Sequence, residues 1–557
     1  MQALKATILA ALLGSSLGCG PSSDAGSDRA VLFARGGLVL CGKPSPGAAL
    51  KVTADNATAR LREGRTVRDG LFFEFPWQPG KSYVLDACSS DGLVSSSHRL
   101  VAPVRPDPVV VLVKTLEDVH AASVTSGGEP DASLAFSADG RLLAVGTFGG
   151  YLRVFDTSSR GCVFERRLPG AVVKRVAVSP DNTRVYAGEM SYDGFVTAFD
   201  LASKRQLWRF RLADELETSK PARPDDFFAL YSYPQAYCMR VAGDDLIVDG
   251  FHSWNDAGPP RHLSRLYRFD GRTGRVKWRF PADAPIKRNI SWFDQDAANL
   301  VFSAYQWERP AADDIEPQAA VYLLETASGG LLDRRAFEPL RPFFDVVPMW
   351  YGLALDGSGH AAVGLMDGRS AIFRISDVGG TRRLEPVREM DLAVPIEVTG
   401  VPIYAGVGWA ASGGRLLFLL TDGRLVAPSA SSGGKTVRAD HPNSNTLFAF
   451  DGESGKLLWQ WKLTTTAQGV ATGKGVLAVS TQQSYSSDDP MDYGLTVFDP
   501  SASGTPVEKM LFRYYTAGPI VALAVSPDGK MIAAVEAPLR LADGVTVVGK
   551  YRLHVLR

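Results

Sequence analysis

The sequence carries no excess of charge of either sign, and after its first residues it has no long apolar run. Its 60 basic residues balance 60 acidic residues, which gives a net charge of zero at pH 7. A nucleic-acid-binding chain would carry a strong basic excess, and a transmembrane helix needs about 20 consecutive apolar residues. The sequence therefore predicts neither a nucleic-acid partner nor a membrane-spanning helix.

Residues that commonly carry catalysis are scarce or scattered. The five cysteines include no adjacent pair, and neither an H-E-x-x-H motif nor a phosphate-binding loop occurs. His252 and His262 are the only histidines close together in the sequence. Asp488, Asp489 and Asp492 offer the oxygen ligands that Ca²⁺ prefers, without the glycine-spaced pattern of a calcium loop. We predict no catalytic residues and no cofactor, with Ca²⁺ at these three residues left as an alternative.

The first residues have the pattern of a bacterial lipoprotein signal. Lys5 precedes an apolar stretch at residues 6–13, and residues 16–19 read Ser-Leu-Gly-Cys, close to a lipobox. The pattern predicts a signal peptide at 1–18, lipidation of Cys19 and a flexible tether at 19–29. Gly20 replaces the Asp typical of inner-membrane retention, so we expect an outer-membrane lipoprotein facing the periplasm or the exterior.

Residues 30–115 alternate apolar and polar residues in short runs between Gly, Pro and Asp turns, which predicts a small β-sandwich. The runs KPSPGAALKV, VRDGLFFEF and KSYVLDA resemble carboxypeptidase-regulatory-like or transthyretin-like modules. Cys41 and Cys88 fall in this segment, and an exported compartment permits disulfides, so we expect them to pair. We interpret the domain as a spacer, with a glycan- or protein-binding module as the alternative.

A ten-residue phrase occurs three times in the rest of the chain. It reads FDLASKRQLW at 199–208, FDGRTGRVKW at 269–278 and FDGESGKLLW at 450–459. A strand end, an Asp, a Gly/Ser turn and a second strand recur at fixed spacing, which is typical of a repeat architecture. Because β-runs alternate with tight turns, the repeats predict the four-stranded blades of a β-propeller.

Counting these runs predicts an all-β protein with an eight-bladed propeller at 116–557. Merging two of the blades, 286–337 and 345–392, would give seven, and this alternative stays open. The last blade, from Ile520, reaches only three strands before the chain ends. An unpaired edge strand would promote aggregation, so we expect a segment near 117–125 to supply its fourth strand.

Long connections occur between the second and third strands of a blade and between successive blades. Because successive strands run in opposite directions, this parity places all of these connections on one face of the ring. Long loops on a rigid scaffold commonly carry recognition, and aromatic residues there supply contact area. We therefore predict a binding face. Its candidate residues are Trp254, Trp307, Trp350, Tyr485 and Tyr493.

The phrase resembles the repeat of quinoprotein (PQQ-type) propellers, and turns such as SPDG at 526–529 resemble WD40-type repeats. In the quinoprotein family the Trp docks between neighbouring blades, which implies structural roles for Trp208, Trp278 and Trp459. The quinone enzymes carry a vicinal cysteine pair that this chain lacks. The chain also resembles the cofactor-free propeller lipoprotein of the outer-membrane β-barrel assembly machine.

These features together predict an envelope-anchored, non-enzymatic scaffold that binds envelope proteins through the long-loop face. Two alternatives stay open. The first is an enzyme at the centre of the ring, either a quinone-dependent dehydrogenase using PQQ and Ca²⁺ or a hydrolase, which needs only two facing carboxylates. The second is a surface glycan-binding protein that uses Trp254, Trp307 and the small domain.

Overall fold

In a computed structural model of the chain, some segments are described by their backbone alone and others together with their side chains. Residues 17–101 are described by the backbone of their strands. Side chains are described from residue 108 onward, outside the segments 118–131, 219–231, 255–260, 307–316, 345–351, 423–440, 464–466, 482–492 and 541–544 and the single residues 399, 505, 507 and 546. Statements about side chains below concern this part of the chain.

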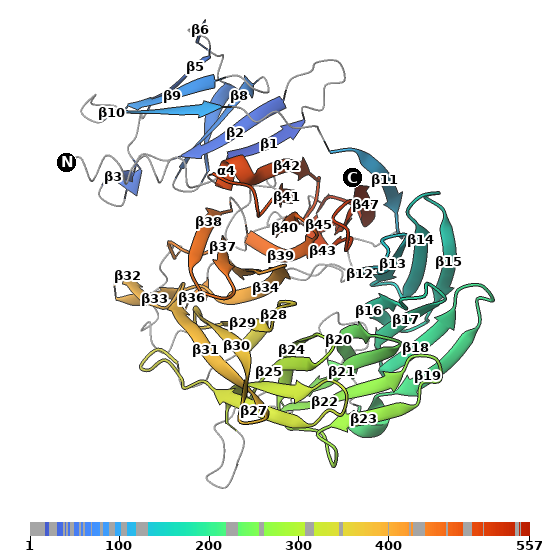
Figure 1. Cartoon of the computed structure of the whole chain (residues 1–557). Coiled ribbons are helices and arrows are strands. Elements are labelled where there is room, and N and C mark those ends of the chain that lie inside the picture. Colours follow the sequence, from blue (N-terminus) through green and yellow to red (C-terminus); the bar gives the residue numbers. More distant parts are fainter. Residues whose placement is uncertain are drawn as a thin grey trace.

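The N-terminal strands form two four-stranded sheets and a short hairpin (Figure 1). The first sheet has the order β1 (Leu17–Pro21), β2 (Ala30–Gly36), β8 (Gly70–Trp77) and β7 (Arg62–Val67). The second has the order β10 (Ser95–Val101), β9 (Ser82–Cys88), β5 (Ala49–Ala54) and β6 (Ala57–Thr58). The hairpin pairs β3 (Val39–Leu40) with β4 (Lys43–Pro44).

Strand β1 crosses the expected boundary between signal peptide and tether. Its residues pair with β2 from Leu17, opposite Ala34, to Pro21, opposite Ala30. The expectation of a flexible tether is therefore wrong for residues 19–21, because their backbone groups complete the edge of the β2 sheet.

The rest of the chain folds into consecutive antiparallel sheets arranged around a common axis, so the predicted all-β propeller is confirmed (Figure 1). We name each blade by its first strand, and its strands a to d run outward from the axis. The first three blades are β12 (Ala132–Phe136), β13 (Leu142–Thr147), β14 (Tyr151–Asp156) and β15 (Cys162–Arg167); β16 (Val172–Val178), β17 (Arg184–Met190), β18 (Phe195–Asp200) and β19 (Gln206–Arg211); and β20 (Gln235–Ala242), β21 (Asp245–Trp254), β22 (Arg261–Asp270) and β23 (Val276–Phe280).

Four further blades complete this series. They are β24 (Asn289–Gln295), β25 (Asn299–Tyr305), β26 (Ala319–Glu325) and β27 (Leu331–Ala336); β28 (Met349–Leu355), β29 (His360–Leu365), β30 (Arg369–Val378) and β31 (Thr381–Asp391); β34 (Val407–Gly413), β35 (Leu416–Thr421), β37 (Thr446–Asp451) and β38 (Leu457–Lys462); and β39 (Thr466–Gly473), β40 (Val476–Gln482), β41 (Gly494–Phe498) and β42 (Met510–Tyr515). The β24 and β28 blades are separate four-stranded sheets.

The last blade is closed by a strand from before the first blade. Strands β43 (Ile520–Val525), β44 (Ile532–Glu536) and β47 (Arg552–Leu556) are joined by β11 (Val110–Thr115), which pairs with β47. The expected closing segment, 117–125, is thus wrong, and the boundary at 115/116 cuts the propeller. The sequence analysis assigned the run VVLVK to the small domain, because its apolar pattern fits a strand of either domain. In the structure this run pairs with the outer edge of β47, whose backbone groups would otherwise be unpaired.

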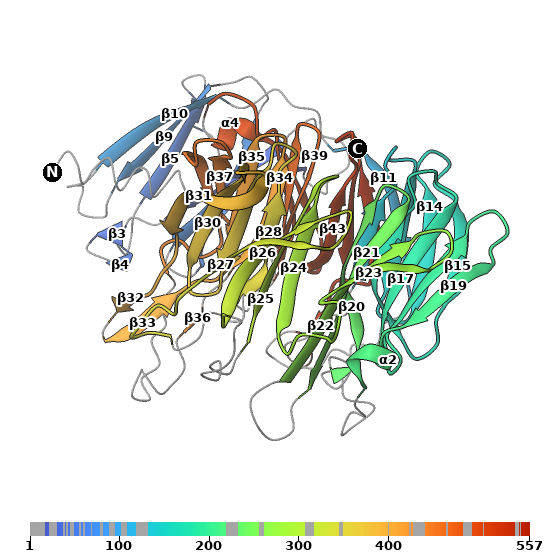
Figure 2. The ribbon, with the colours of Figure 1, turned by 60° about the horizontal axis from the view of Figure 1, so that its bottom comes forward.

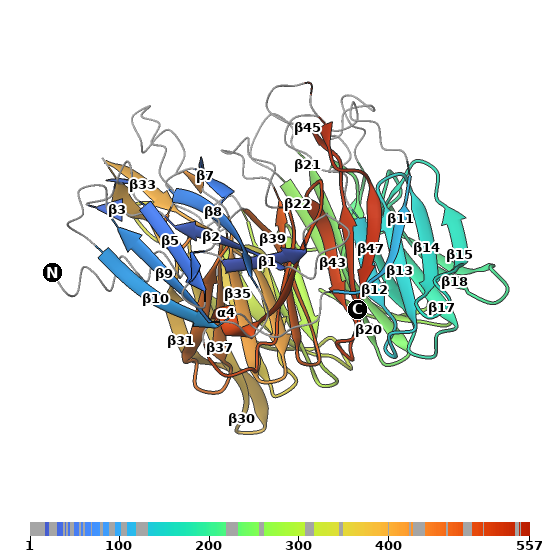
Figure 3. The same cartoon turned by 90° about the horizontal axis from the view of Figure 1, so that it is seen from above.

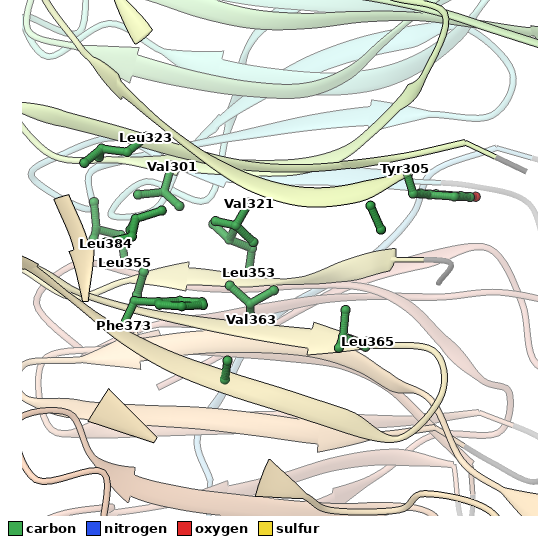
Figure 4. Packing of buried hydrophobic residues seen from close by; sticks show 13 residues of the cluster. Val301, Tyr305, Val321, Leu323, Leu353, Leu355, Val363, Leu365, Phe373 and Leu384 are labelled. Carbon is green, nitrogen blue, oxygen red and sulfur yellow. The ribbon is translucent and has the colours of Figure 1, made fainter. Parts of the chain in front are cut away.

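Apolar side chains between adjacent blades form the cores of the ring. Figure 4 shows one such layer between the β24 and β28 blades. Its fully buried members include Val301, Val321, Leu323, Leu353, Val363 and Phe373. Burying apolar area yields roughly 25 cal/mol per Å², so each blade is stabilised mainly by its two neighbours.

One position in the outermost strand recurs in every blade described. It pairs with strand c immediately next to a shift in register, the mark of a β-bulge. We call it the docking position. It is occupied by Leu112, Phe164, Trp208, Trp278, Asp333, Arg388, Trp459 and Phe512.

Aromatic residues at the docking position reach the next blade. The Trp208 ring lies 5.7 Å from the Phe269 ring in strand c of the β20 blade, and its Nε1–H donates to the carbonyl of Gly271 at 3.1 Å. Trp459 lies 5.8 Å from Phe498 in the same way. Trp208 and Trp459 therefore each pack on a Phe near the end of strand c in the following blade, an aromatic contact worth about 0.5–1.5 kcal/mol beyond its buried area.

Two blades make the same connection with charged groups. Asp333 accepts a hydrogen bond of 2.8 Å from the backbone N–H of Leu384 in the next blade and lies 3.5 Å from the Arg383 guanidinium. Arg388 donates to the carbonyl of Gly455 in the turn of its neighbour at 2.9 Å. The position thus links consecutive blades even where the Trp is absent.

The Asp of the phrase builds the turn that receives this contact. In the β20 blade, the carboxylate of Asp270 accepts hydrogen bonds from the backbone N–H groups of Arg272 and Thr273 and from the Thr273 hydroxyl. Such bonds lower the pKa of Asp270 and fix the turn locally. Gly274 follows at φ +71°, and a Cβ there would lie 2.6 Å from the Trp208 ring.

Helices are short in the described part of the chain. They are α2 (Ala213–Leu216) and α4 (Pro506–Lys509), and no described helix is long and apolar enough to cross a membrane.

We expect Trp208→Ala to lower the free energy of unfolding by about 3–5 kcal/mol, because it empties a buried site between two blades. Urea denaturation followed by circular dichroism measures this loss. Leu207→Ala, at a neighbouring side chain that is 45% exposed, should change stability by no more than about 0.5 kcal/mol. Equal effects of the two substitutions would contradict the docking role.

Candidate docking face

The connections between strands b and c and those between blades lie on the same side of the ring. Their described parts meet there: β32 (Ile396–Val398) and β33 (Val401–Tyr404) precede the β34 blade, and β33 pairs with β36 (Leu425–Val426) from between β35 and β37. The hairpin β45 (Leu539–Arg540) and β46 (Val547–Val548) lies between β44 and β47. Figure 2 shows β33, β36 and α2 along this side.

The opposite side consists mostly of tight turns, with one long hairpin and one longer connection, between β41 and β42, which contains α4. Strands β30 and β31 extend beyond their neighbours to a turn at Gly379 and Gly380, both with positive φ. Figure 3 shows β30 projecting on this side, away from β45 and the ends of β21 and β22. Most of the long connections therefore lie on one side, which we call the docking face.

Trp254 lies at the end of β21 on this face and is fixed by its neighbour. Its ring stacks on that of His252 at 4.5 Å. The two ring nitrogens of His252 lie 2.7 Å from the carbonyl oxygen of Leu216 and 3.1 Å from that of Ser232. Burial lowers the pKa of His252 although these carbonyls favour the charged ring. The Trp254 side chain thus rests on a rigid support and is itself only half-buried.

Two tyrosines belong to the same end of the adjoining blade. Tyr192 and Tyr233 pack edge to face with their ring centres 6.1 Å apart, and Tyr192 is exposed. The hydroxyl of Thr218 donates to the Tyr192 carbonyl at 2.7 Å, which ties the segment after α2 to this connection. Trp254, Tyr192 and Tyr233 make up what we call the Trp254 patch.

A second group lies on the docking face beside the β34 blade. Tyr404 packs edge to face on Phe344 at 4.9 Å. Asp422, at the end of β35, accepts a hydrogen bond of 2.9 Å from the Gly406 N–H. Burial raises the pKa of Asp422 to about 8, and burial followed by the nearby charges of Asp422 and Asp367 raises that of Tyr404 to about 12. Asp422 and Tyr404 therefore take up protons at a higher pH than the free side chains do.

Of the five predicted face residues, Trp254 is the one whose surface position the structure describes. Trp307 and Tyr485 lie outside the described residues, and Trp350 is described by its backbone within β28 alone. Tyr493 was wrongly assigned to the surface: it is 1% exposed, because it immediately precedes β41 and turns into the ring.

The remaining predicted sites fall outside the described side chains. Asp488, Asp489 and Asp492 lie in an undescribed segment, as does Cys41, while Cys19 and Cys88 are described by backbone alone. Among the residues with described side chains, Cys162 and Cys238 are free thiols, and no group of three or more His, Cys, Asp or Glu could hold a metal.

The sequence analysis missed Tyr192, because the connection 191–194 is short and was not counted among the long segments. Its available signal was the parity argument itself, which places every connection between strands b and c on this face. A rigid, partly exposed Trp with neighbouring tyrosines is suited to contact with another macromolecule, since aromatic side chains are enriched at binding hot spots.

Comparison with known proteins gives one family match. The WD domain, G-beta repeat family matches residues 112–156, a stretch that begins within β11 and ends with β14. This stretch holds the strand that closes the last blade and the first three strands of the β12 blade.

The solved structures that are similar to this chain include the following two. One is the crystal structure of BamB from Moraxella catarrhalis, at 12% identity and a TM-score of 0.44 over 81% of this chain and 99% of that one. The other is the computationally designed Ika8 protein, at 13% identity and a TM-score of 0.43 over 76% of this chain and 98% of that one. No curated protein matches the sequence.

We expect the free energy of unfolding to fall between about pH 5 and pH 8 through Asp422. Since folding raises its pKa to about 8, its stabilising contribution is complete below its unfolded pKa of about 4 and is lost as pH rises through 8. Asp422→Asn keeps an acceptor for Gly406 and should flatten this slope in denaturation series across pH.

Asp181→Asn is the control for that series, because the pKa of Asp181 is lowered to about 2 by its hydrogen bonds and its contribution is lost only in acid. A slope between pH 5 and pH 8 that persists unchanged in Asp422→Asn would contradict the assignment.

Proposed function

We propose that this protein is an envelope-anchored scaffold that binds other envelope proteins through its docking face and has no catalytic role. In this proposal the ring is an eight-bladed propeller, the two N-terminal sheets form a β-sandwich spacer, and a lipid on Cys19 holds the protein at the outer membrane. Six four-stranded sheets support the blade count, together with an eight-stranded sheet whose halves, β16 to β19 and β20 to β23, join only at Met190 and Gln235. The match to a WD repeat agrees with a propeller of this type.

The asymmetry between the two sides of the ring carries the proposal. On one side Asp-centred turns are closed by their own hydrogen bonds. On the other, the chain places its long connections together with the supported Trp254 patch. Binding surfaces are commonly built from long connections that a rigid frame holds together on one side.

The Trp254 patch has the features of an interface anchor. His252 is 1% exposed and both of its ring nitrogens face backbone carbonyls, so the support of Trp254 is already ordered before any partner binds. Binding that orders few side chains costs less free energy, and rigid aromatic anchors therefore contribute most to affinity. We place the contact with a protein partner at this patch.

The test is crosslinking of the tagged full-length protein in intact envelopes, with the captured proteins identified by mass spectrometry. We expect Trp254→Ala to reduce recovery of a specific partner, with a loss of about 2 kcal/mol or more in a subsequent binding measurement with that purified partner. Combining it with Tyr192→Ala should lower recovery further.

Val378→Ala is the matched control, because Val378 is an exposed apolar side chain on the β30–β31 hairpin of the opposite side. It should leave recovery unchanged. If the Trp254 and Val378 variants recover the same partners in equal amounts, the docking face is misassigned; if no partner exceeds background, the scaffold proposal fails.

A further inference from the structure

The inner strands of the blades share a short motif that serves as an internal comparison. Aligned on their strand pairing, they read SLAFS (133–137), RVAVS (175–179), CMRVA (238–242), WFDQD (292–296), GLALD (352–356), WAASG (409–413), GVATG (469–473) and ALAVS (522–526). The third position is Ala in six of the eight motifs. It is Arg240 in the β20 blade and Asp294 in the β24 blade.

Arg240 and Asp294 lie beside each other, and Trp292 and Arg175 lie next to them. The Arg240 guanidinium lies 3.7 Å from the Asp294 carboxylate and 5.3 Å from the centre of the Trp292 ring. Arg175, first in its own motif, reaches the same ring at 5.2 Å. Three consecutive blades thus bring two guanidinium groups to one indole near the axis.

Solvent reaches this cluster. Arg240 is 38% exposed and Asp294 24% exposed, although both belong to the innermost strands. The adjoining Tyr237, 5.9 Å from the Arg175 guanidinium, is also only half-buried. A dissolved group of small size can therefore contact the arginines from the axis of the ring.

The hydrogen-bonding capacity of the cluster is incompletely used within the described residues. Arg175 donates to the Lys174 carbonyl at 2.8 Å, and its buried Nε has no hydrogen-bond acceptor among them. Asp249 is fully buried, with neither carboxyl oxygen hydrogen-bonded to any described residue. Burial raises the pKa of Asp249 well above the usual range, although the nearby charge of Arg175 opposes the shift.

Asp294 is shared between Arg240 and backbone N–H groups. One of its oxygens accepts the backbone N–H of Leu355 at 3.0 Å, and burial raises its pKa despite the neighbouring Arg240. Arginine forks form paired, charge-assisted hydrogen bonds with carboxylates and phosphates, and these are the groups that such a cluster selects.

We propose that Arg175 and Arg240, together with Trp292, form a binding site for an oxyanion, carboxylate or phosphate, at the axis of the ring. The flat face of Trp292 positions the two guanidinium groups by cation–π contact, and Asp294 holds Arg240 in place when the site is empty. The site is separate from the Trp254 patch, so it stands or falls independently of the docking proposal.

The test is isothermal titration calorimetry on the full-length protein with three probes at constant ionic strength: inorganic phosphate, succinate and hexaglutamate. Binding of at least one probe is expected. Binding of phosphate or succinate identifies a free small anion as a sufficient ligand, whereas binding of hexaglutamate alone identifies acidic side chains of a polypeptide.

Two variants return the site to the repeat pattern and should therefore fold. Arg240→Ala restores the residue of six other motifs, and Arg175→Ser restores that of the β12 blade; each should weaken binding about tenfold or more, as expected for loss of a charge-assisted contact. Arg272→Gln, at an exposed turn arginine, is the control and should bind like the parent chain.

Asp294→Ala provides a change of opposite sign, because it removes the carboxylate that competes for Arg240 and should tighten binding, a result that misfolding would not produce. The proposal is overturned if no probe binds saturably, if the Arg240 and Arg175 variants bind as well as Arg272→Gln, or if Asp294→Ala weakens binding.

Discussion

The fold depends on one contact, the reach of a single residue in each outer strand to the blade that follows it. The β-bulge beside that residue sets its direction, and the turn of the next blade receives it in the Trp208, Trp278 and Arg388 contacts. In the Trp208 example a buried ring, a hydrogen bond to Gly271 and the absence of a Cβ at Gly274 fit together. Repeated around the ring, this contact joins each blade to the next, in addition to the apolar packing between them.

This constraint explains why the two sides of the ring differ. The turns that receive the docking residues are on one side, where most of the connections are short. Connections on the other side receive no docking residue and can lengthen at little cost, since loop closure entropy grows slowly with length. The side whose connections can lengthen carries the Trp254 patch. At the axis the blades differ from one another by substitution instead, as Arg240 and Asp294 show.

The sequence predicted the parts of the fold that repeat with the same residues. Three phrases with Trp indicated the blades, but Asp333 and Arg388 occupy the same position with different chemistry and could not be recognised without the strand pairing. The closing strand was misplaced because an apolar run such as 109–114 fits several sheets, and only the unpaired edge of β47 decides between them. Parity located the docking face, yet Tyr493 shows that parity does not determine burial. The axis cluster has a sequence signal, the break in an alanine column, which becomes visible only once the inner strands are aligned.

The most direct test of this account is native-state hydrogen exchange in Trp278→Ala, compared with the parent chain. Trp278 donates to the Thr326 carbonyl in the turn of the next blade, and the Gly329 N–H closes that turn on Glu325. The account predicts faster exchange of the Gly329 amide, while the Gly455 amide, which closes the equivalent turn of the distant β34 blade, keeps its rate. Equal acceleration at both turns, or no change at Gly329, would contradict the claim that this contact holds each blade to the next.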